Sequence, residues 1–245
     1  MSSFVDKMKQ HVSVRDFEDT PLSDEIKDNL LTAARSGSSS NFVQAFSIIE
    51  ITDSEIQKEL AELSNNAAYV IKTGAFYVFI ADLYRQATML ATHNLSLEGI
   101  QNMEALLVSI VDTTIAAENM AVAAESMELG ICYIGGIRNN LKRVAELLDL
   151  PPYTVPLFGL TIGVPRSKNE VKPRMPKANQ VSRNSYNKAV FTNLSQYDKE
   201  TKTYYAERGN HQLDATWSAR NIDFFKQARR TDVGDFLKKQ GFSLK

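Results

Sequence analysis

One long helical segment, from Asn102 to Leu129, constrains how this chain can fold more than any other stretch. It contains neither Pro nor Gly and is rich in Ala, Met, Leu and Glu, which favour helix. Its apolar residues cover more than one narrow stripe, so we expect the helix to be buried on several sides. A partner subunit is one source of that cover, and Gly130 is expected to cap the helix.

Short apolar segments alternate with helical patterns along most of the chain. A helix is expected after the N-cap residue Ser23, because acidic residues and then an apolar stripe follow it. Further helical patterns cover residues 54–63 and 138–148. Four apolar runs are typical of buried strands: residues 42–51, 75–81, 131–137 and 155–165. This alternation predicts an α+β or α/β layered fold, and no GxGxxG motif follows a strand to indicate a Rossmann site.

The sequence becomes more polar and less regular after Pro165. Residues 166–202 are polar and irregular, and clear helical patterns return later, as at residues 215–229. Such a tail is typical of an arm that lies over another surface, rather than of a second domain with its own core. We therefore expect one domain over residues 1–245, in which residues 166–245 form an extended arm and C-terminal helices.

Composition and charge disfavour several classes of function. The formal net charge is −1, which gives no electrostatic case for nucleic acid or for an anionic membrane. The single cysteine, Cys132, excludes an intrachain disulfide, fits a reducing cytoplasm, and lies in an apolar run typical of a core residue. His11, His93 and His211 lie far apart in sequence, so we expect no metal site. The N-terminal segment lacks the apolar core of a signal peptide, and no uninterrupted apolar run approaches the ~20 residues that span a bilayer.

Two cationic clusters are candidates for binding an anion such as a phosphate. In HVSVR, alternation along an extended segment places His11, Ser13 and Arg15 on one side. In VKPRMP, proline stiffens the segment that presents Lys172 and Arg174. Arg can bind a phosphate bidentately, and Lys acts as a point charge. Each cluster alone is better explained as exposed basic chain, so the phosphate interpretation depends on their convergence.

Two segments of small residues are candidates for contact with a polyol or a flat ring. Ser39, Ser40 and Asn41, in GSSSN, can hydrogen-bond such a ligand, but they also suit an ordinary loop. The segment Tyr133-Ile134-Gly135-Gly136 ends a predicted strand, and its missing Cβ atoms would let a ring approach the backbone. A tight turn explains those glycines equally well. Neither a Ser-His-Asp order nor paired carboxylates support hydrolase chemistry.

The order of these segments resembles the NADPH-dependent group of the oxygen-insensitive nitroreductase family. The stretches that carry the resemblance are SVRDF, SGSSSNFVQAFSII, YIGGIRNN, VPLFGLTIGVP, KPRMP and a late YYAERG followed by TW. The resemblance implies an α+β fold with a central, mostly antiparallel sheet flanked by helices. It also implies a homodimer whose C-terminal arms wrap the partner, with FMN at each of two subunit interfaces and NADPH or NADH as electron donor.

Carried over residue by residue, the resemblance implies several parts of a flavin site. The FMN phosphate would be surrounded by cationic and hydroxyl side chains: His11, Ser13, Lys172 and Arg174. The N1 and O2 edge of the ring would face Arg15. The partner subunit would contribute small polar residues: Ser39, Ser40 and Asn41. The ring would lie along one segment, with a glycine amide near N5 and O4: Tyr133, Ile134, Gly135 and Gly136.

Two positions depart from the family pattern. The family often has a Gln at the pyrimidine edge of the flavin, where SNNAAYV has Ala67, with Tyr69 close by. That hydrogen bond is lost, or it comes from Asn66 or a backbone group. NADPH-preferring members use two arginines on the 2′-phosphate; Arg208 matches the first, but the second falls near Leu213-Asp214. An acidic residue beside a phosphate weakens binding, so NADPH, NADH or both stay open.

The implied activity is hydride transfer from NAD(P)H to flavin N5, and then to a nitroaromatic, quinone or free flavin acceptor, with ping-pong kinetics. No side chain is needed as a nucleophile or an obligatory base, so the site residues are expected to bind the cofactor. One alternative is a non-catalytic flavin-binding sensor module. A purely structural dimer would be indicated if the basic clusters lay apart.

Overall fold

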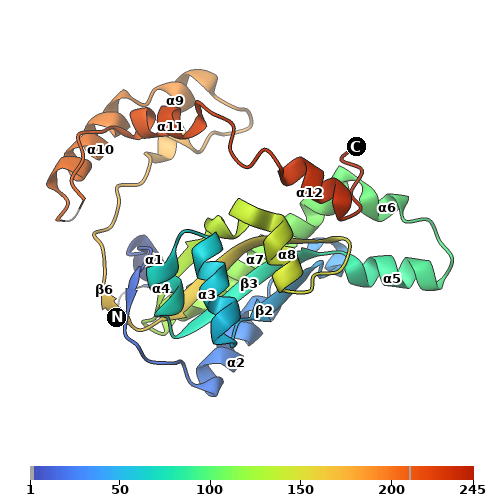
Figure 1. Cartoon of the computed structure of the whole chain (residues 1–245). Coiled ribbons are helices and arrows are strands. Elements are labelled where there is room, and N and C mark those ends of the chain that lie inside the picture. The colour runs from blue at the N-terminus through green and yellow to red at the C-terminus, as the bar shows by residue number, and fades with distance from the viewer. Residues whose placement is uncertain (1–2, 210) are drawn as a thin grey trace. The chain divides into compact units, whose positions relative to one another are not determined.

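The computed structural model describes residues 3–209 and 211–245, which form two compact units (Figure 1). The first unit contains residues 3–169 and 230–245, and the second contains residues 170–229. The boundary between the units follows the point at which the sequence becomes polar.

A four-stranded antiparallel sheet forms the centre of the first unit. Its strands lie in the order β2 (Phe46–Glu50), β3 (Ala75–Asp82), β5 (Thr154–Gly163) and β4 (Gly130–Ile134). In the register of the sheet, Phe79 of β3 pairs with Ile48 on one side and with Phe158 on the other. The predicted α+β fold, with a mostly antiparallel sheet flanked by helices, is confirmed.

Helices cover this sheet, and a second, two-stranded sheet pairs β1 (Asp16–Phe17) with β6 (Pro165–Ser167). The helices of the first unit are α1 (Phe4–Lys9), α2 (Asp24–Arg35), α3 (Ser54–Leu63), α4 (Ala67–Ile71), α5 (Tyr84–Thr92), α6 (Glu98–Gln101), α7 (Met103–Ser126), α8 (Leu141–Leu147) and α12 (Val233–Lys239). Short 3₁₀ helices are η1 (Ser40–Phe42) and η2 (Gly135–Asn140). Ser23 accepts a hydrogen bond from the Ile26 amide, so the predicted N-cap of α2 is confirmed.

Alternate residues of β3 enter two cores, one on each face of the sheet. Tyr77 and Phe79 pack with α2 and α7. Phe76, Val78 and Ile80 pack with α3 and α8 on the opposite face. Each side chain of this size stabilises the fold by about 2 kcal/mol when it is fully buried. Burial on both faces explains why β3 is apolar without interruption.

Helix α7 supports one face of the sheet and contacts all four strands. By length and composition alone it could cross a membrane, but it packs as a core helix and buries polar as well as apolar side chains. Thr113 donates to the Ser109 carbonyl, and Ser109 donates to the Ala45 carbonyl. Its outer side stays uncovered within the chain, since Leu107 is 50% and Val111 is 53% exposed.

The predicted end of α7 is wrong in one detail. The helix ends at Ser126, Met127 is the C-cap, and Glu128 adopts a positive φ of 63°. Gly130 instead begins β4, where a Cβ atom would lie 2.5 Å from Cγ2 of Val14. Gly130 is therefore required by the packing of the N-terminal segment, not by the helix end.

The predicted strand over residues 42–51 begins only at Phe46. The residues before it form a tight loop in which Asn41, Phe42 and Gln44 have φ values of 46°, 59° and 49°. The left-handed region is unfavourable for side chains of this kind, so contacts elsewhere must hold the loop in this conformation.

Asp112 of α7 holds that loop. Its side chain is buried, and the two carboxylate oxygens accept hydrogen bonds from the Ser40 amide at 2.9 Å and from the Ala45 amide at 3.1 Å. Ser39 adds a bond inside the loop, because its hydroxyl accepts from the Gln44 amide at 3.2 Å. One buried carboxylate on the long helix thus determines the path of residues 39–45.

The second unit is helical and has a small core of its own. Its elements are η3 (Lys177–Asn179), α9 (Lys188–Thr192), α10 (Ser195–Glu207) and α11 (Trp217–Phe225). Tyr197 and Thr201 are buried, and the Tyr197 ring centre lies 5.9 Å from that of Trp217. The prediction of an irregular segment up to Lys202 is therefore wrong for α9 and for the start of α10, whose sequences are polar but helical.

Replacing Asp112 with Ala is expected to lower the free energy of unfolding by about 3 kcal/mol, because two amides of the strained loop lose their acceptors. Urea denaturation at one fixed protein concentration measures the change. Thr114→Ala, on the exposed side of the same helix, is the matched control. Equal stability of the two variants would show that Asp112 does not hold the loop.

Candidate functional site

The HVSVR segment runs beside β4, at the edge of the main sheet. Ser13 forms a parallel bridge with Ile131, and the Val14 amide donates to the Ile131 carbonyl at 2.8 Å. Val14 is buried while Arg15 is exposed, so the two side chains point to opposite sides. The predicted alternation is confirmed at these two positions, and it leaves Arg15 at the surface.

Arg15 lies against the aromatic ring of Tyr69, which belongs to α4. Its guanidinium carbon is 5.9 Å from the ring centre, within the range of a cation–π contact. Burial raises the pKa of the Tyr69 phenol, and the Arg15 charge opposes that rise. Burial likewise raises the pKa of the Cys132 thiol, again opposed by Arg15. Cys132 is a buried core residue, as predicted, and Arg15 is the cation beside it.

The end of β4 presents an aromatic ring and an open glycine. Tyr133 is 37% exposed, packs edge-on against Phe158 and donates its hydroxyl hydrogen to Glu118 at 3.1 Å. Partial burial and the Glu118 carboxylate raise the pKa of the Tyr133 phenol, so this group stays protonated. A Cβ atom on Gly135 would meet only Nη2 of Arg138, at 3.5 Å. Gly135 is therefore open to a flat ligand.

Gly136 serves a different purpose from Gly135. A Cβ atom there would lie 2.1 Å from the Ser64 carbonyl oxygen, so any side chain would collide with the end of α3. Packing against Ser64 is thus sufficient to explain Gly136. Ile134 is buried in the core on the side of the sheet that α3 covers. Of the segment that ends β4, Tyr133 and Gly135 are the residues that face outward.

Asn66, the neighbour of Ala67, makes two side-chain hydrogen bonds within its own segment. The side-chain nitrogen of Asn66, Nδ2, donates to the Ser64 carbonyl at 2.6 Å, and the side-chain oxygen accepts from the Tyr69 hydroxyl. Both ends of Asn66 are thus engaged. Ala67 begins α4, and its side chain lies outside the part of the structure that is described. Loss of the hydrogen bond, its supply by Asn66 and its supply by a backbone group all stay open, because an Asn side chain has a second donor hydrogen and a second acceptor lone pair.

Three acidic residues of α7 connect the candidate segments, and sequence reasoning missed all three. Asp112 holds the Ser40 loop, Glu118 accepts from Tyr133, and Glu125 lies 2.6 Å from Nδ1 of His11. Their presence inside a strongly apolar helix was the sequence signal that could have marked these carboxylates as contact residues. Glu118 and Glu125 are seven residues apart, so they share one face of the helix.

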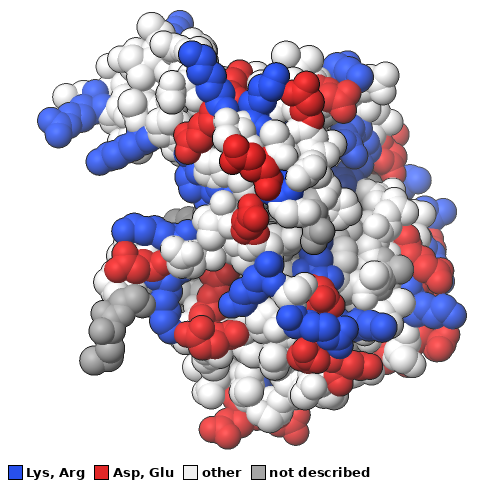
Figure 2. Space-filling view, turned by 90° about the vertical axis from the view of Figure 1, so that its left-hand side faces the viewer, with Lys and Arg blue, Asp and Glu red and all other residues white. Residues whose placement is uncertain are grey.

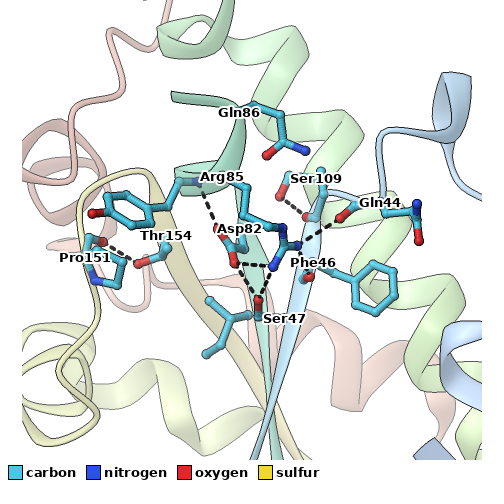
Figure 3. Close-up of polar contacts among 12 residues, drawn as sticks. Gln44, Phe46, Ser47, Asp82, Arg85, Gln86, Ser109, Pro151 and Thr154 are labelled. Atoms are coloured by element: carbon cyan, nitrogen blue, oxygen red, sulfur yellow. Dashed lines mark hydrogen bonds and ion pairs between the residues drawn. The ribbon is translucent and has the colours of Figure 1, made fainter. Parts of the chain in front are cut away.

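Figure 3 shows how the exit of the Ser39–Asn41 loop is fixed where it enters β2. Arg85 of α5 donates to the carbonyls of Gln44 and Phe46, at 3.0 and 2.5 Å, and to the Ser47 hydroxyl. The same guanidinium pairs with Asp82 at 3.3 Å. Ser39, Ser40 and Asn41 thus sit on a braced loop whose neighbour Phe42 is 80% exposed.

The remaining predicted site residues lie in the second unit. Lys172 and Arg174 flank Pro173, whose carbonyl accepts from the Tyr197 hydroxyl at 3.0 Å and so anchors the segment. Nε of Arg208 donates to the His211 carbonyl at 2.6 Å. Basic and acidic side chains are interspersed over the face seen in Figure 2. The first unit therefore contains His11, Ser13, Arg15, Tyr69 and the end of β4, while the second contains Lys172, Arg174 and Arg208.

Comparison with known proteins identifies the family. The nitroreductase family model matches residues 8–164, and the model for the C-terminal domain of the nitroreductase family matches residues 172–245. The chain is 42% identical over 249 residues to a protein named FMN reductase (NADPH) from Bacillus subtilis (strain 168), covering 99% of each sequence. It is 37% identical over 245 residues to an oxygen-insensitive NADPH nitroreductase from Salmonella typhimurium, covering 100% of each.

A solved structure gives the same result. The NADPH:FMN oxidoreductase from Vibrio harveyi, complexed with NAD+, superimposes with a TM-score of 0.88 at 34% identity, covering 99% of each chain. The match of both the sequence and the fold extends over the first and the second unit alike. The chain therefore belongs to the nitroreductase family.

Proposed function

We propose that this chain is an FMN-dependent reductase that takes electrons from NAD(P)H and passes them to nitroaromatic, quinone or free flavin acceptors in the cytoplasm. The proposal rests on the contact of Arg15 with the Tyr69 ring and on the open position at Gly135, directly after β4. Relatives named for FMN and NADPH support the cofactor and the electron donor.

The residues at this place fit FMN by their chemistry. Gly135 has an uncovered surface that a flat ring can approach, and Tyr133 offers part of an aromatic ring beside it. Arg15 is an exposed cation against the Tyr69 ring, and its charge suits the electron-rich pyrimidine edge of a flavin. His11 and Ser13 belong to the segment that runs beside β4, and both side chains suit a phosphate. The second unit holds two further candidate phosphate-binding cations, Lys172 and Arg174.

Bound FMN supplies the redox chemistry, since it accepts a hydride from the nicotinamide and returns two electrons to an acceptor. Arg15 would stabilise negative charge at the pyrimidine edge, which favours delivery of electrons in pairs. The Tyr133 hydroxyl donates to Glu118 and is thereby kept in one orientation. Nicotinamide and acceptor would occupy the same open face in turn, which makes the proposed kinetic order ping-pong.

The purified protein is expected to be yellow, and anaerobic addition of NADPH or NADH should bleach the flavin absorbance. Initial rates at several acceptor concentrations should give parallel double-reciprocal lines, because the two substrates bind in turn. A protein that holds FMN but is bleached by neither nucleotide would support the sensor alternative. Intersecting lines would contradict the ping-pong order.

Replacing Arg15 with Gln is expected to weaken FMN binding about tenfold, because a charge-assisted contact to the cofactor is lost. The midpoint potential of the bound flavin should also fall. Quenching of FMN fluorescence measures the first change, and reductive titration measures the second. Arg143→Gln, which breaks an exposed ion pair with Glu59, is the control. The assignment fails if both variants bind FMN as the parent does.

The proposal includes a homodimer built on the outer side of α7. Val111, Glu118 and Glu125 recur at seven-residue intervals and therefore share one face. That face carries exposed apolar surface at Leu107 and Val111 and also the two acids that contact Tyr133 and His11. Exposed apolar surface beside functional groups is typical of an interface. A partner seated there would supply its Ser39 loop to complete the site.

The second unit offers a separate surface for the partner. Ile222, Phe224 and Phe225 of α11 are 69%, 50% and 73% exposed, which is unusual for side chains of this size. An arm that wraps a second subunit would bury them. Of the predicted arm over residues 166–245, residues 170–229 form the second unit, and residues 166–169 and 230–245 belong to the first. We propose that residues 170–229 wrap the partner, within a single functional domain that includes the whole chain.

Val111→Arg is expected to convert the dimer to a monomer, because a charged side chain would replace an apolar one within the proposed interface. The same variant should lose FMN, since each site would lack its partner loop. Sedimentation velocity at micromolar concentration measures the first change, and flavin absorbance measures the second. Leu95→Arg is the control, because Leu95 is 58% exposed but lies away from α7. A stable monomer that keeps FMN would contradict the dimeric site.

A further inference from the structure

The second unit places two arginines over one tyrosine ring. The guanidinium carbon of Arg208 lies 5.1 Å from the ring centre of Tyr205, and that of Arg220 lies 5.5 Å from it. Tyr205 belongs to α10 and Arg220 to α11, so residues from two helices and the connecting loop converge here. The arrangement concentrates positive charge next to an aromatic surface.

Hydrogen bonds between α10 and α11 fix the position of Arg220. The Trp217 amide donates to the Thr201 hydroxyl at 3.0 Å, and the Ser218 amide donates to the Asp198 carboxylate at 2.8 Å. Both bonds lie at the start of α11, within one turn of Arg220. The place of Arg220 relative to α10 is therefore determined by the packing of the helix pair.

Arg208 is held by the loop that connects the two helices. Its guanidinium donates from Nε and Nη2 to the His211 carbonyl. The Leu213 amide donates in turn to the Tyr205 carbonyl at 2.9 Å, which returns the loop to the end of α10. Nη1 of Arg208 takes no part in these bonds.

The acidic residues nearby are paired with lysines. Asp214 lies 3.0 Å from Nζ of Lys202, and Asp223 lies 2.7 Å from Nζ of Lys226. Among residues 3–209 and 211–245, no carboxylate lies within ion-pair distance of Arg208 or Arg220. The negative charge of Asp214, which weighs against phosphate binding in the sequence, is thus offset by Lys202.

We propose that Arg220 acts with Arg208 to bind the 2′-phosphate of NADPH, so that the enzyme prefers NADPH to NADH. This inference rests on the proposed function. The two nucleotides differ by one phosphate monoester, and a dianion of this kind suits two guanidinium groups better than one. Arg220 supplies, from the following helix, the second cation that the loop itself lacks at Leu213-Asp214.

Steady-state kinetics with both nucleotides test this assignment. Arg220→Ala is expected to raise the KM for NADPH about tenfold and to leave the KM for NADH nearly unchanged. Arg208→Ala should do the same, and the double variant should show less than the product of the two effects, because both side chains bind one group. Arg229→Ala is the matched control, since Arg229 lies 4.5 Å from the ring centre of Phe224 in the same unit.

Inhibition by nucleotide fragments adds a readout that does not depend on turnover of NADPH. With NADH as donor, adenosine 2′,5′-bisphosphate should inhibit the parent enzyme more strongly than AMP, and Arg220→Ala should abolish that difference. The assignment is overturned if Arg220→Ala changes both nucleotides equally or neither, or if inorganic phosphate inhibits as strongly as the bisphosphate. A parent protein oxidising neither nucleotide would instead refute the proposed function.

Discussion

The first unit depends on carboxylates placed along one apolar helix. A buried carboxylate is costly unless hydrogen bonds compensate for its lost hydration, and Asp112 recovers that cost from two backbone amides. Those bonds decide the path of the loop that carries Ser39, Ser40 and Asn41. About two and four turns further along, Glu118 and Glu125 contact Tyr133 and His11 on the outer face of the same helix. A single rigid element thus orients three segments that are distant in sequence.

Helix α7 therefore contributes to the stability of the fold, to the proposed dimer and to the proposed flavin site. The inner side of α7 supports the sheet, while its outer side combines exposed apolar residues with acids that contact proposed flavin-binding side chains. A change on the outer face would therefore affect the site and the dimer together. The same logic explains why a long helix can be apolar around most of its circumference: the sheet covers one side, and a second subunit is proposed for the other.

Much of the fold could be predicted from local pattern, and most of the site from resemblance. The buried strand over residues 75–81 follows from an uninterrupted apolar run, the N-cap Ser23 from capping, and the body of the long helix, though not its end, from composition. The loop before β2 could not be predicted from its own residues, because its apolar side chains favour a strand. The left-handed backbone there depends on Asp112, some seventy residues away in sequence. Gly130 and Gly136 were likewise explained only by the side chain and carbonyl packed against them.

Nucleotide preference shows why charge in a loop must be judged in three dimensions. In sequence, Asp214 lies near the place where a second cation is expected, and that leaves NADPH, NADH or both open. In the folded unit, Lys202 pairs with Asp214, and Arg220 approaches the Tyr205 ring from the next helix. Helix packing, through Thr201 and Asp198, carries Arg220 to that place. In the proposed phosphate site, a neighbouring helix thus supplies the cation that the loop motif lacks, and the loss of one cation from a motif would not by itself reverse cofactor specificity.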